Sequence, residues 1–129
     1  MPFARIDLSN NHPEGSGQQV GEIVYGALQQ YLNVPENDKF QVITRHDSNE
    51  LVTPKTYLGI DYSEGIIFIQ VTLNEGRTTE MKKNFYKAIC DGVVQKLKVR
   101  PQDIIINLIE VNKENWSFGN GDMQYGPKA

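Results

Sequence analysis

The sequence has little of what several common classes of protein depend on. It holds one cysteine, Cys90, which rules out an internal disulfide and favours a reducing, cytoplasmic setting. Its two histidines, His12 and His46, are too few and too far apart for a zinc site. A glycine-rich phosphate loop and a GxSxG motif are also missing. We therefore expect no metal and no cofactor.

Basic charge and long apolar segments are scarce as well. The formal net charge is -3, which argues against a nucleic-acid partner, because such proteins usually carry a basic stripe. No apolar run approaches the roughly 20 residues that a membrane helix needs. The start of the chain lacks the basic and apolar regions of a signal peptide. The sequence thus predicts neither a nucleic-acid partner nor a membrane partner.

What the sequence does contain is an internal repeat. A shift of 65 positions aligns the two halves without a gap, so that residues 2–8 fall on 67–73 and Asp38 falls on Asp103. Identities are few, but the hydrophobic pattern stays in phase, which indicates a repeated unit. We expect one domain over residues 1–129. Its parts are a first half at 2–45, a connector at 46–65, a second half at 66–111 and a tail at 112–129.

Each half is predicted to form a strand, a helix and a second strand. Short β-prone segments open the halves at 2–8 and 66–73 and close them at 39–45 and 103–111. Apolar residues recur at helical spacing between these strands. They are Val20, Ile23, Val24, Ala27, Leu28, Tyr31 and Leu32 in the first helix, and Met81, Phe85, Ala88, Ile89, Gly92, Val93 and Leu97 in the second.

The ends of the two helices carry their own signals. Glycines weaken a helix by about 1 kcal/mol each relative to alanine, and the first helix has Gly17, Gly21 and Gly26. They indicate either close packing or a late helix start near Gln18. Thr78 or Thr79 is expected to cap the second helix, and the connector is expected to be a loop with a short hairpin.

A helical crossover makes the two strands of each half parallel. The expected fold is therefore α/β (α+β), a duplicated β-α-β arrangement with a four-stranded sheet and two helices on one face. Period-two alternation turns Ile6, Leu8, Val71 and Leu73 toward the helices and Phe3, Arg5, Phe68, Gln70 and Thr72 away from them. Since subunit interfaces often mix aromatic and polar groups, we expect an oligomer; a partly wet face on a monomer is the alternative.

Several short motifs carry a resemblance to a known family. They are Met1-Pro2-Phe3 at the start, Val34-Pro35-Glu36-Asn37-Asp38 before the second strand, Arg77 before the second helix, Phe85-Tyr86-Lys87 within it and Trp116-Ser117-Phe118-Gly119 in the tail. With them the chain resembles the tautomerase superfamily, and within it the malonate semialdehyde decarboxylase group most. The resemblance implies a homotrimer with active sites at subunit boundaries, and Pro2 as the catalytic amine once Met1 is removed.

The resemblance also implies roles for single residues. Asp38 matches an aspartate that assists the proline and orients water, and Arg77 matches an arginine that binds the substrate carboxylate. Glu75 stands where the decarboxylase pattern has a second arginine, and this departure favours the wider tautomerase interpretation. Trp116 and Phe118 are expected to line the pocket; packing on a neighbouring subunit is their alternative role.

Structural roles compete with these assignments. Asp38 can serve only to turn the chain into a strand, and its repeat partner Asp103 stands in the same local context. Arg77 can be a solvated residue ahead of a helix, although a loop at a helix start also suits anion binding. Its repeat partner, His12, is expected to be a surface histidine rather than part of a vestigial site.

The chemistry expected of Pro2 follows from its free secondary amine. An α-amino group titrates near pH 7.7–8.0; burial lowers its pKa and a nearby carboxylate raises it. A neutral amine can move a proton in keto–enol tautomerisation of a small keto acid. A protonated one polarises a carbonyl, which suits a malonate semialdehyde decarboxylase or hydratase. A non-catalytic oligomeric binding module that kept the fold is the third hypothesis.

Overall fold

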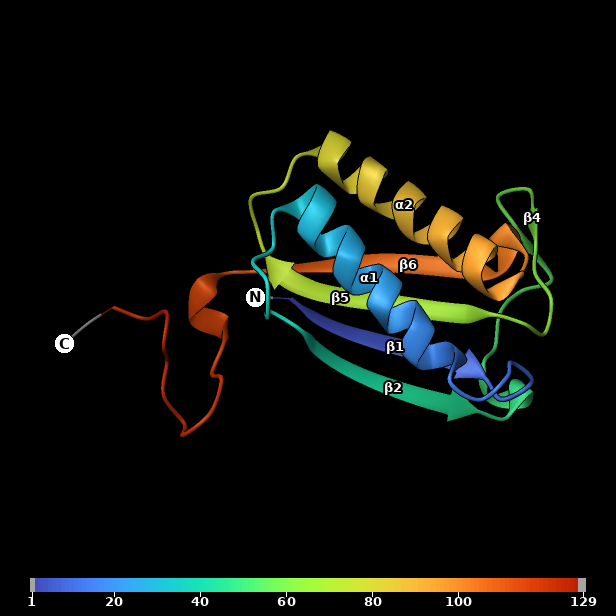
Figure 1. The fold of residues 1–129 in the computed structure, drawn as a ribbon, viewed down its shortest axis with the longest axis horizontal. Helices are drawn as coiled ribbons and strands as arrows, with labels where there is room; N and C mark the ends of the chain where they lie inside the picture. Colours follow the sequence, from blue (N-terminus) through green and yellow to red (C-terminus); the bar gives the residue numbers. More distant parts are fainter. Residues whose placement is uncertain (1, 128–129) are drawn as a thin grey trace.

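The computed structural model describes residues 2–127, and the expected removal of Met1 lies outside this range. Two long helices and a four-stranded sheet make up most of the chain (Figure 1). The main elements are β1 (Phe3–Ser9), α1 (Ser16–Leu32), β2 (Phe40–His46), β5 (Ile67–Asn74), α2 (Thr79–Leu97) and β6 (Ile104–Val111). A two-stranded hairpin of β3 (Thr56–Tyr57) and β4 (Ile60–Asp61) lies in the connector, as predicted.

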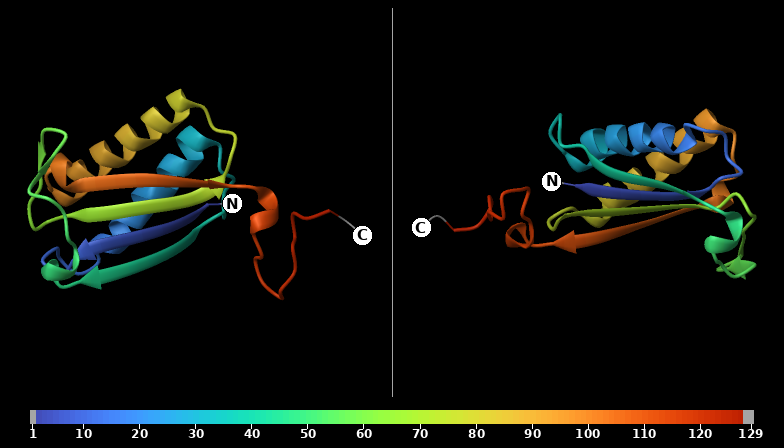
Figure 2. Two further views of the ribbon diagram at one scale, coloured as in Figure 1. Left: turned by 180° about the vertical axis from the view of Figure 1, so that it is seen from behind. Right: turned by 90° about the horizontal axis from the view of Figure 1, so that it is seen from below.

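The sheet has the order β2-β1-β5-β6. β1 is parallel to β2 and β5 is parallel to β6, whereas the two central strands, β1 and β5, are antiparallel. Both helices cover the same face of this sheet, which Figure 2 shows most clearly in its right-hand view. The predicted fold is confirmed, because each helical crossover returns the chain parallel to the strand that it left.

The core lies between the helices and the sheet. Ala4, Ile6 and Leu8 of β1 are at most 1% exposed, and the intervening side chains face the other way. The remaining buried apolar residues come from β5 and from the facing stripes of the helices: Ile67, Ile69, Val71, Leu73, Val20, Val24, Leu28, Phe85, Ile89 and Val93. Truncating one of the largest, as in Phe85→Ala, is expected to cost about 3–5 kcal/mol of stability.

The helix ends correct one prediction. α1 begins at Ser16 and not near Gln18, so Gly17 and Gly21 lie within it. A side chain at Gly17 would collide with Ile43 of β2, and the space at Gly21 is taken by Gln41, whose side chain donates to the Gly21 carbonyl oxygen at 2.8 Å. The close-packing interpretation therefore holds for both glycines.

The second helix begins as predicted at a threonine cap. The hydroxyl oxygen of Thr78 accepts a hydrogen bond from the Met81 backbone N–H at 3.2 Å, which satisfies one of the open donors of the first turn. Within residues 2–127, neither α1 nor α2 is long and apolar enough to cross a membrane. The closing strands begin one residue later than predicted, at Phe40 and Ile104.

The tail leaves the sheet at the end of β6. After a short 3-10 turn at Lys113–Asn115, it extends beyond the end of the sheet at which β1 begins (Figure 1). Hydrogen bonds of its own hold it together: Gln124 accepts from the Phe118 backbone N–H at 3.0 Å and donates to the Gly119 carbonyl oxygen at 3.1 Å. The tail is thus a small folded unit attached to one end of the sheet.

Candidate active site

Pro2 lies at the end of the sheet from which the tail departs. It is buried and directly precedes β1. Phe3 pairs with Phe40, the first residue of β2, and with Thr72, close to the end of β5. The loop before β2 and the loop after β5 therefore both flank Pro2. These two loops carry Asp38 and Arg77, so the topology brings the three predicted residues to one end of the sheet.

Asp38 lies in a tight turn immediately before β2. Its backbone N–H donates to the Pro35 carbonyl oxygen at 3.3 Å, and Asn37 takes a left-handed conformation with φ 74°. The hydroxyl of Tyr25 on α1 accepts from the Asn37 backbone N–H at 2.9 Å, which ties the turn to the helix. Over residues 2–127, no hydrogen bond or ion pair from another side chain engages the half-buried Asp38 carboxylate. The turn-forming role and a free carboxylate thus coexist here.

Arg77 is held firmly in the loop between β5 and α2. Its Nε and Nη2 donate to the Leu32 carbonyl oxygen at 3.2 and 2.9 Å, and its Nη1 donates to the Asn74 carbonyl oxygen at 2.9 Å. Leu32 is the last residue of α1, where a cation is favoured by the helix dipole. The half-buried Arg77 is therefore not the solvated residue of the alternative interpretation.

The hydrogen-bond count of Arg77 leaves room for a ligand. A guanidinium has five N–H donors, and three of them are used by the Leu32 and Asn74 carbonyl oxygens. The other two have no partner within residues 2–127, and two is the number that a carboxylate accepts in a bidentate pair. One side chain can thus close the end of α1 and hold an acid group.

Glu75 does not pair with Arg77. It is exposed, its backbone N–H donates to the Val111 carbonyl oxygen at 3.0 Å, and none of the ion pairs formed within residues 2–127 includes it. The acidic group whose pKa is changed by this loop is Glu110, which sequence analysis missed. Its pKa is lowered chiefly by a hydrogen bond from Lys82, and further by the Gly76 backbone N–H and the charge of Arg77.

Aromatic side chains from the tail and the sheet line a small, partly open cavity beside Pro2. It has a volume of about 250 Å³ and is lined by Phe3, Phe40, Trp116, Ser117 and Phe118. We call it the aromatic cavity. The rings of Trp116 and Phe118 are stacked, with centroids 5.3 Å apart and planes at 15°. Phe118 also contacts Phe40, at 5.9 Å between centroids.

Two residues of this region escaped sequence analysis. Phe40 lines the aromatic cavity, and only its register with Phe3 could have indicated this. Asn74, the last residue of β5, accepts a hydrogen bond from the Trp116 indole N–H on its Oδ1 at 2.7 Å. A polar residue at a strand end gives no signal of such a contact, because the tail that supplies the donor is 42 residues away in sequence.

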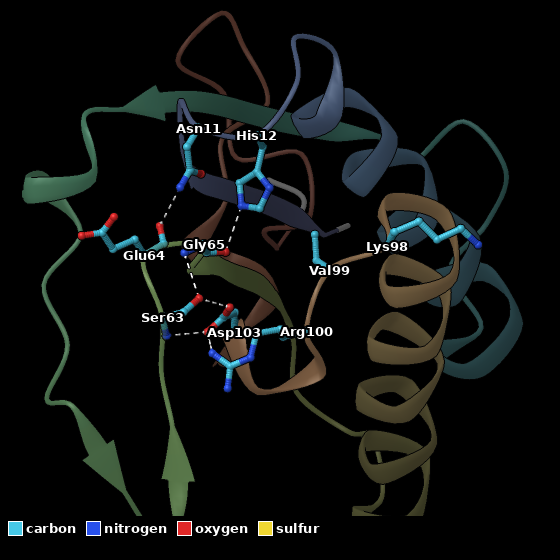
Figure 3. Close-up of a pocket in the computed structure, with 9 residues that line it drawn as sticks. All are labelled: Asn11, His12, Ser63, Glu64, Gly65, Lys98, Val99, Arg100 and Asp103. Carbon is cyan, nitrogen blue, oxygen red and sulfur yellow. Dashed lines mark hydrogen bonds and ion pairs between the residues drawn. The ribbon is translucent and has the colours of Figure 1, made fainter.

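A larger cavity lies at the opposite end of the sheet. It has a volume of about 560 Å³ and is shown in Figure 3 with its lining residues: Asn11, His12, Ser63, Glu64, Gly65, Lys98, Val99, Arg100 and Asp103. The 65-residue repeat relates His12 to Arg77 and Asp103 to Asp38. This region, which we call the His12 cavity, is therefore the repeat counterpart of the Pro2 region.

In the His12 cavity, the repeat counterparts of Asp38, Arg77 and Pro2 are differently placed, although Glu64 and Lys98 also line it. Asp103 is 2% exposed and accepts hydrogen bonds from the backbone N–H and the hydroxyl of Ser63, with Arg100 Nη1 at 3.5 Å. His12 is buried, not on the surface as predicted, and its Nε2 lies 2.9 Å from the Gly65 carbonyl oxygen. Ile67 takes the place of Pro2, and its nitrogen is in a peptide bond with Ile66. Despite its size, this cavity is not the better candidate.

Side chains that bind metal ions do not cluster in the described part of the chain. In residues 2–127 there is no group of three or more His, Cys, Asp or Glu side chains that could hold a metal ion.

Known proteins resemble this chain over nearly its whole length. Probable tautomerase YusQ of Bacillus subtilis (strain 168) is 36% identical over 124 residues, which cover 96% of this chain and 98% of that protein. The structure of FG41 malonate semialdehyde decarboxylase inhibited by 3-bromopropiolate has 31% identity and a TM-score of 0.87, covering 95% and 93% of the two chains. A symmetric trimer of wild-type fused 4-OT has the same fold, with 17% identity, a TM-score of 0.75 and coverage of 92% and 93%.

A sequence model of one family supports the same conclusion. The family described as tautomerase enzyme matches residues 38–119, which include Asp38, the loop of Arg77 and the aromatic tail up to Gly119. The high identity to YusQ and the fold shared with the decarboxylase agree with this match. The chain belongs to the tautomerase superfamily, with malonate semialdehyde decarboxylase among its relatives.

Proposed function

We propose that this protein is a tautomerase that uses the Pro2 amine, free once Met1 is removed, to interconvert the keto and enol forms of a small keto acid. The observation that carries the proposal is the convergence at one end of the sheet. The buried Pro2, the Asp38 carboxylate, which has no side-chain partner within residues 2–127, and Arg77, two of whose donors are unused within that range, all lie there. The aromatic cavity adjoins them.

The proposed reaction is a proton transfer in two steps. Neutral Pro2 takes a proton from the carbon next to the carbonyl group, and the electron pair of that C–H bond forms the enolate. The protonated Pro2 then gives its proton to the enolate oxygen, which yields the enol; the reverse sequence returns the keto form. Asp38 stabilises the protonated amine, and Arg77 binds the substrate carboxylate through its two remaining N–H groups.

The protonation state of Pro2 decides which chemistry is favoured. Burial disfavours the charged amine and lowers its pKa, whereas a neighbouring carboxylate raises it. Extending the β1–β2 register by one residue sets Pro2 beside Lys39, next to Asp38. Lys39 is neutralised in part by an ion pair with Glu22. We therefore infer that Asp38 raises the Pro2 pKa, while the positive charge of Arg77 opposes it.

Decarboxylation or hydration of malonate semialdehyde is the second candidate function. It is favoured by the 31% identity to FG41 malonate semialdehyde decarboxylase. Glu75 argues against this function, because an acid close to Arg77 weakens the attraction between Arg77 and the substrate carboxylate. Following enol loss by ultraviolet absorbance and acetaldehyde release in a coupled assay distinguishes the two activities on one preparation.

A trimer is the assembly that we propose. The uncovered face of the sheet exposes apolar side chains, among them Phe40 at 43%, Val42 at 39% and Ile109 at 39%. Fused 4-OT, which shares the fold, forms a symmetric trimer. Light scattering is expected to give three times the chain mass, and a stable monomer at micromolar concentration would contradict the proposal.

Labelling of the amine tests the proposed function directly. The FG41 enzyme is inhibited by 3-bromopropiolate, so this compound is a suitable electrophile. We expect a mass consistent with loss of Met1 and one adduct on Pro2. The competing nucleophile is weak: burial, and secondarily the charge of Asp91, raises the pKa of the Cys90 thiol above its ordinary 9.0, which leaves it protonated at neutral pH. A Cys90→Ser variant should label equally; adducts on Cys90 or on a lysine would refute the proposal.

A further inference from the structure

We propose that Asn74 determines substrate range at the Pro2 site by holding Trp116 at a fixed distance from Arg77. This inference rests on the proposed function and names the substrate class: keto acids with a flat aromatic substituent. Asn74 is a positioning residue, since it acts through Trp116 and Arg77 and need not touch the substrate.

Asn74 joins two parts of the site through different atoms. Its side-chain Oδ1 accepts from the Trp116 indole N–H at 2.7 Å, and its main-chain carbonyl oxygen accepts from Arg77 Nη1 at 2.9 Å. Asn74 itself pairs with Val111 at the end of the β5–β6 ladder. The anchor for an acid group and the wall for an apolar group are thus fixed to the same strand end.

Trp116 depends on this contact for its attachment to the sheet. Among the hydrogen bonds of residues 2–127, the bond to Asn74 is the one that links the tail segment 112–127 to another part of the protein. The other link is aromatic: Phe118 packs on Phe40, and Trp116 stacks on Phe118. Without the Asn74 bond, the indole would be held by stacking alone and could turn or withdraw from the cavity.

The dimensions of the cavity indicate the ligand. A cavity of about 150 Å³ lined by apolar side chains can hold benzene, so the aromatic cavity of about 250 Å³ has room for one six-membered ring. Its walls are the rings of Phe3, Phe40, Trp116 and Phe118, which favour a flat apolar group by offset or edge contacts. An arylpyruvate can place its carboxylate on Arg77 and its ring in this cavity. A three-carbon acid has no ring to place there.

The experiment compares Asn74→Leu with the parent on a long and a short acid. Loss of one hydrogen bond is typically worth about 3- to 10-fold in an equilibrium, and we expect this increase in KM for the enol of phenylpyruvate with kcat nearly unchanged. Inhibition by pyruvate, which has no ring, should not change. Equal effects on both acids, or none, would overturn the inference.

Fluorescence gives a second readout that does not depend on turnover. Trp116 is the single tryptophan of the chain, so its emission reports the indole environment directly. Asn74→Leu should shift the emission to the red and weaken the quenching by phenylpyruvate. Asn74→Asp, which keeps an acceptor at Oδ1, should restore the parental emission. Unchanged emission in Asn74→Leu would refute the role of Asn74.

Matched variants separate this inference from its alternatives. Asn10→Leu removes a similar side-chain bond, from Asn10 to Asp47 Oδ1 at 2.9 Å, outside the Pro2 region, and should change neither KM nor emission. Trp116→Phe removes the indole N–H that donates to Asn74, and it replaces Asn74→Leu in the test if that variant does not fold. It should raise the KM for the enol of phenylpyruvate, and an unchanged KM would count against the inference. If the parent binds phenylpyruvate but shows no turnover, the proposed function fails, and the fluorescence titration alone decides the role of Asn74.

Discussion

The two ends of the sheet are related by the 65-position shift of the sequence and differ in chemistry. At the Pro2 end, the Asp38 carboxylate has no side-chain partner within residues 2–127, and Arg77 keeps two free donors. At the other end, Asp103 is buried and bonded to Ser63 and Arg100, and His12 is buried against Gly65. A chain has one N-terminal amine, so only one end can use it. The other aspartate serves to hold the connector in place.

Removing the amine should break this comparison most strongly. Insertion of one glycine between Met1 and Pro2 leaves Pro2 in an amide after processing, so it can no longer accept a proton. We expect tautomerase kcat/KM to fall by about 100-fold or more, the range of a lost acid–base group. Pro2→Ala, which retains a primary amine, should lose only part of the activity. Full activity in the insertion variant would disprove a role for the amine.

The two aspartates provide the sharpest internal contrast. Asp38→Asn should lower kcat/KM by more than about 10-fold, a conservative bound for a lost acid–base role, while the unfolding temperature stays near that of the parent. Asp103→Asn should behave in the opposite way. It leaves Ser63 and Arg100 poorly partnered, which should cost about 1–3 kcal/mol of stability with activity per folded molecule retained.

Thermal unfolding and kinetics on the same two preparations check this contrast. If Asp38→Asn loses stability and keeps its activity, then Asp38 has only the turn-forming role. If Asp103→Asn loses activity while it stays folded, the two ends are functionally linked.

The loop of Glu75 and Arg77 should set the balance between two activities. Glu75→Arg adds a cation where the decarboxylase pattern has one and should raise decarboxylation relative to tautomerisation. A change of about 1.4 kcal/mol in carboxylate binding corresponds to tenfold. Arg77→Ala should weaken both activities and also destabilise the fold by about 1 kcal/mol, since it opens the bond to Leu32.

The measurements are the two rates and the unfolding free energy of each variant. Efficient decarboxylation by the unmodified protein, or indifference of both rates to Arg77→Ala, would contradict this account of the loop.

The smallest predicted effect concerns pH and Glu110. The hydrogen bond from Lys82 lowers the Glu110 pKa below its ordinary 4.5. A carboxyl with a lowered pKa stabilises the fold above its unfolded-state pKa, and this stabilisation is lost as the pH falls through the folded-state pKa. Lys82→Met should thus be slightly less stable than the parent at pH 7, and the difference should shrink below pH 4.5. Urea unfolding at pH 7 and pH 3 tests this; a difference that grows in acid would reverse the assignment.

Much of the fold could be predicted from the sequence because its signals are local and repeated. Period-two alternation in 2–8 and 66–73 identified the buried face, and helical spacing placed both helices. The start of α1 could not be placed, because glycine propensity opposes a helix while contacts with Ile43 and Gln41, distant in sequence, favour it. Tertiary packing outweighed local preference at that point.

The candidate site was predictable only in part, for a similar reason. Pro2, Asp38 and Arg77 are far apart in the sequence, and the strand register brings them to one end of the sheet. The partners of Arg77 could not be foreseen, because they are backbone oxygens, which every residue has. His12 was expected at the surface because its burial depends on Gly65, 53 residues away.

The tight contact between α1 and β2 also limits how this protein can be made more robust. Replacing a helical glycine by alanine usually adds about 1 kcal/mol of stability, but Gly17 is closed to this change by Ile43. At Gly21 the change would require the Gln41 side chain to move and give up its hydrogen bond to the Gly21 carbonyl oxygen. Gly26 is exposed and would meet nothing within 4 Å. An engineer, or natural variation, therefore has one open position among the three glycines of α1.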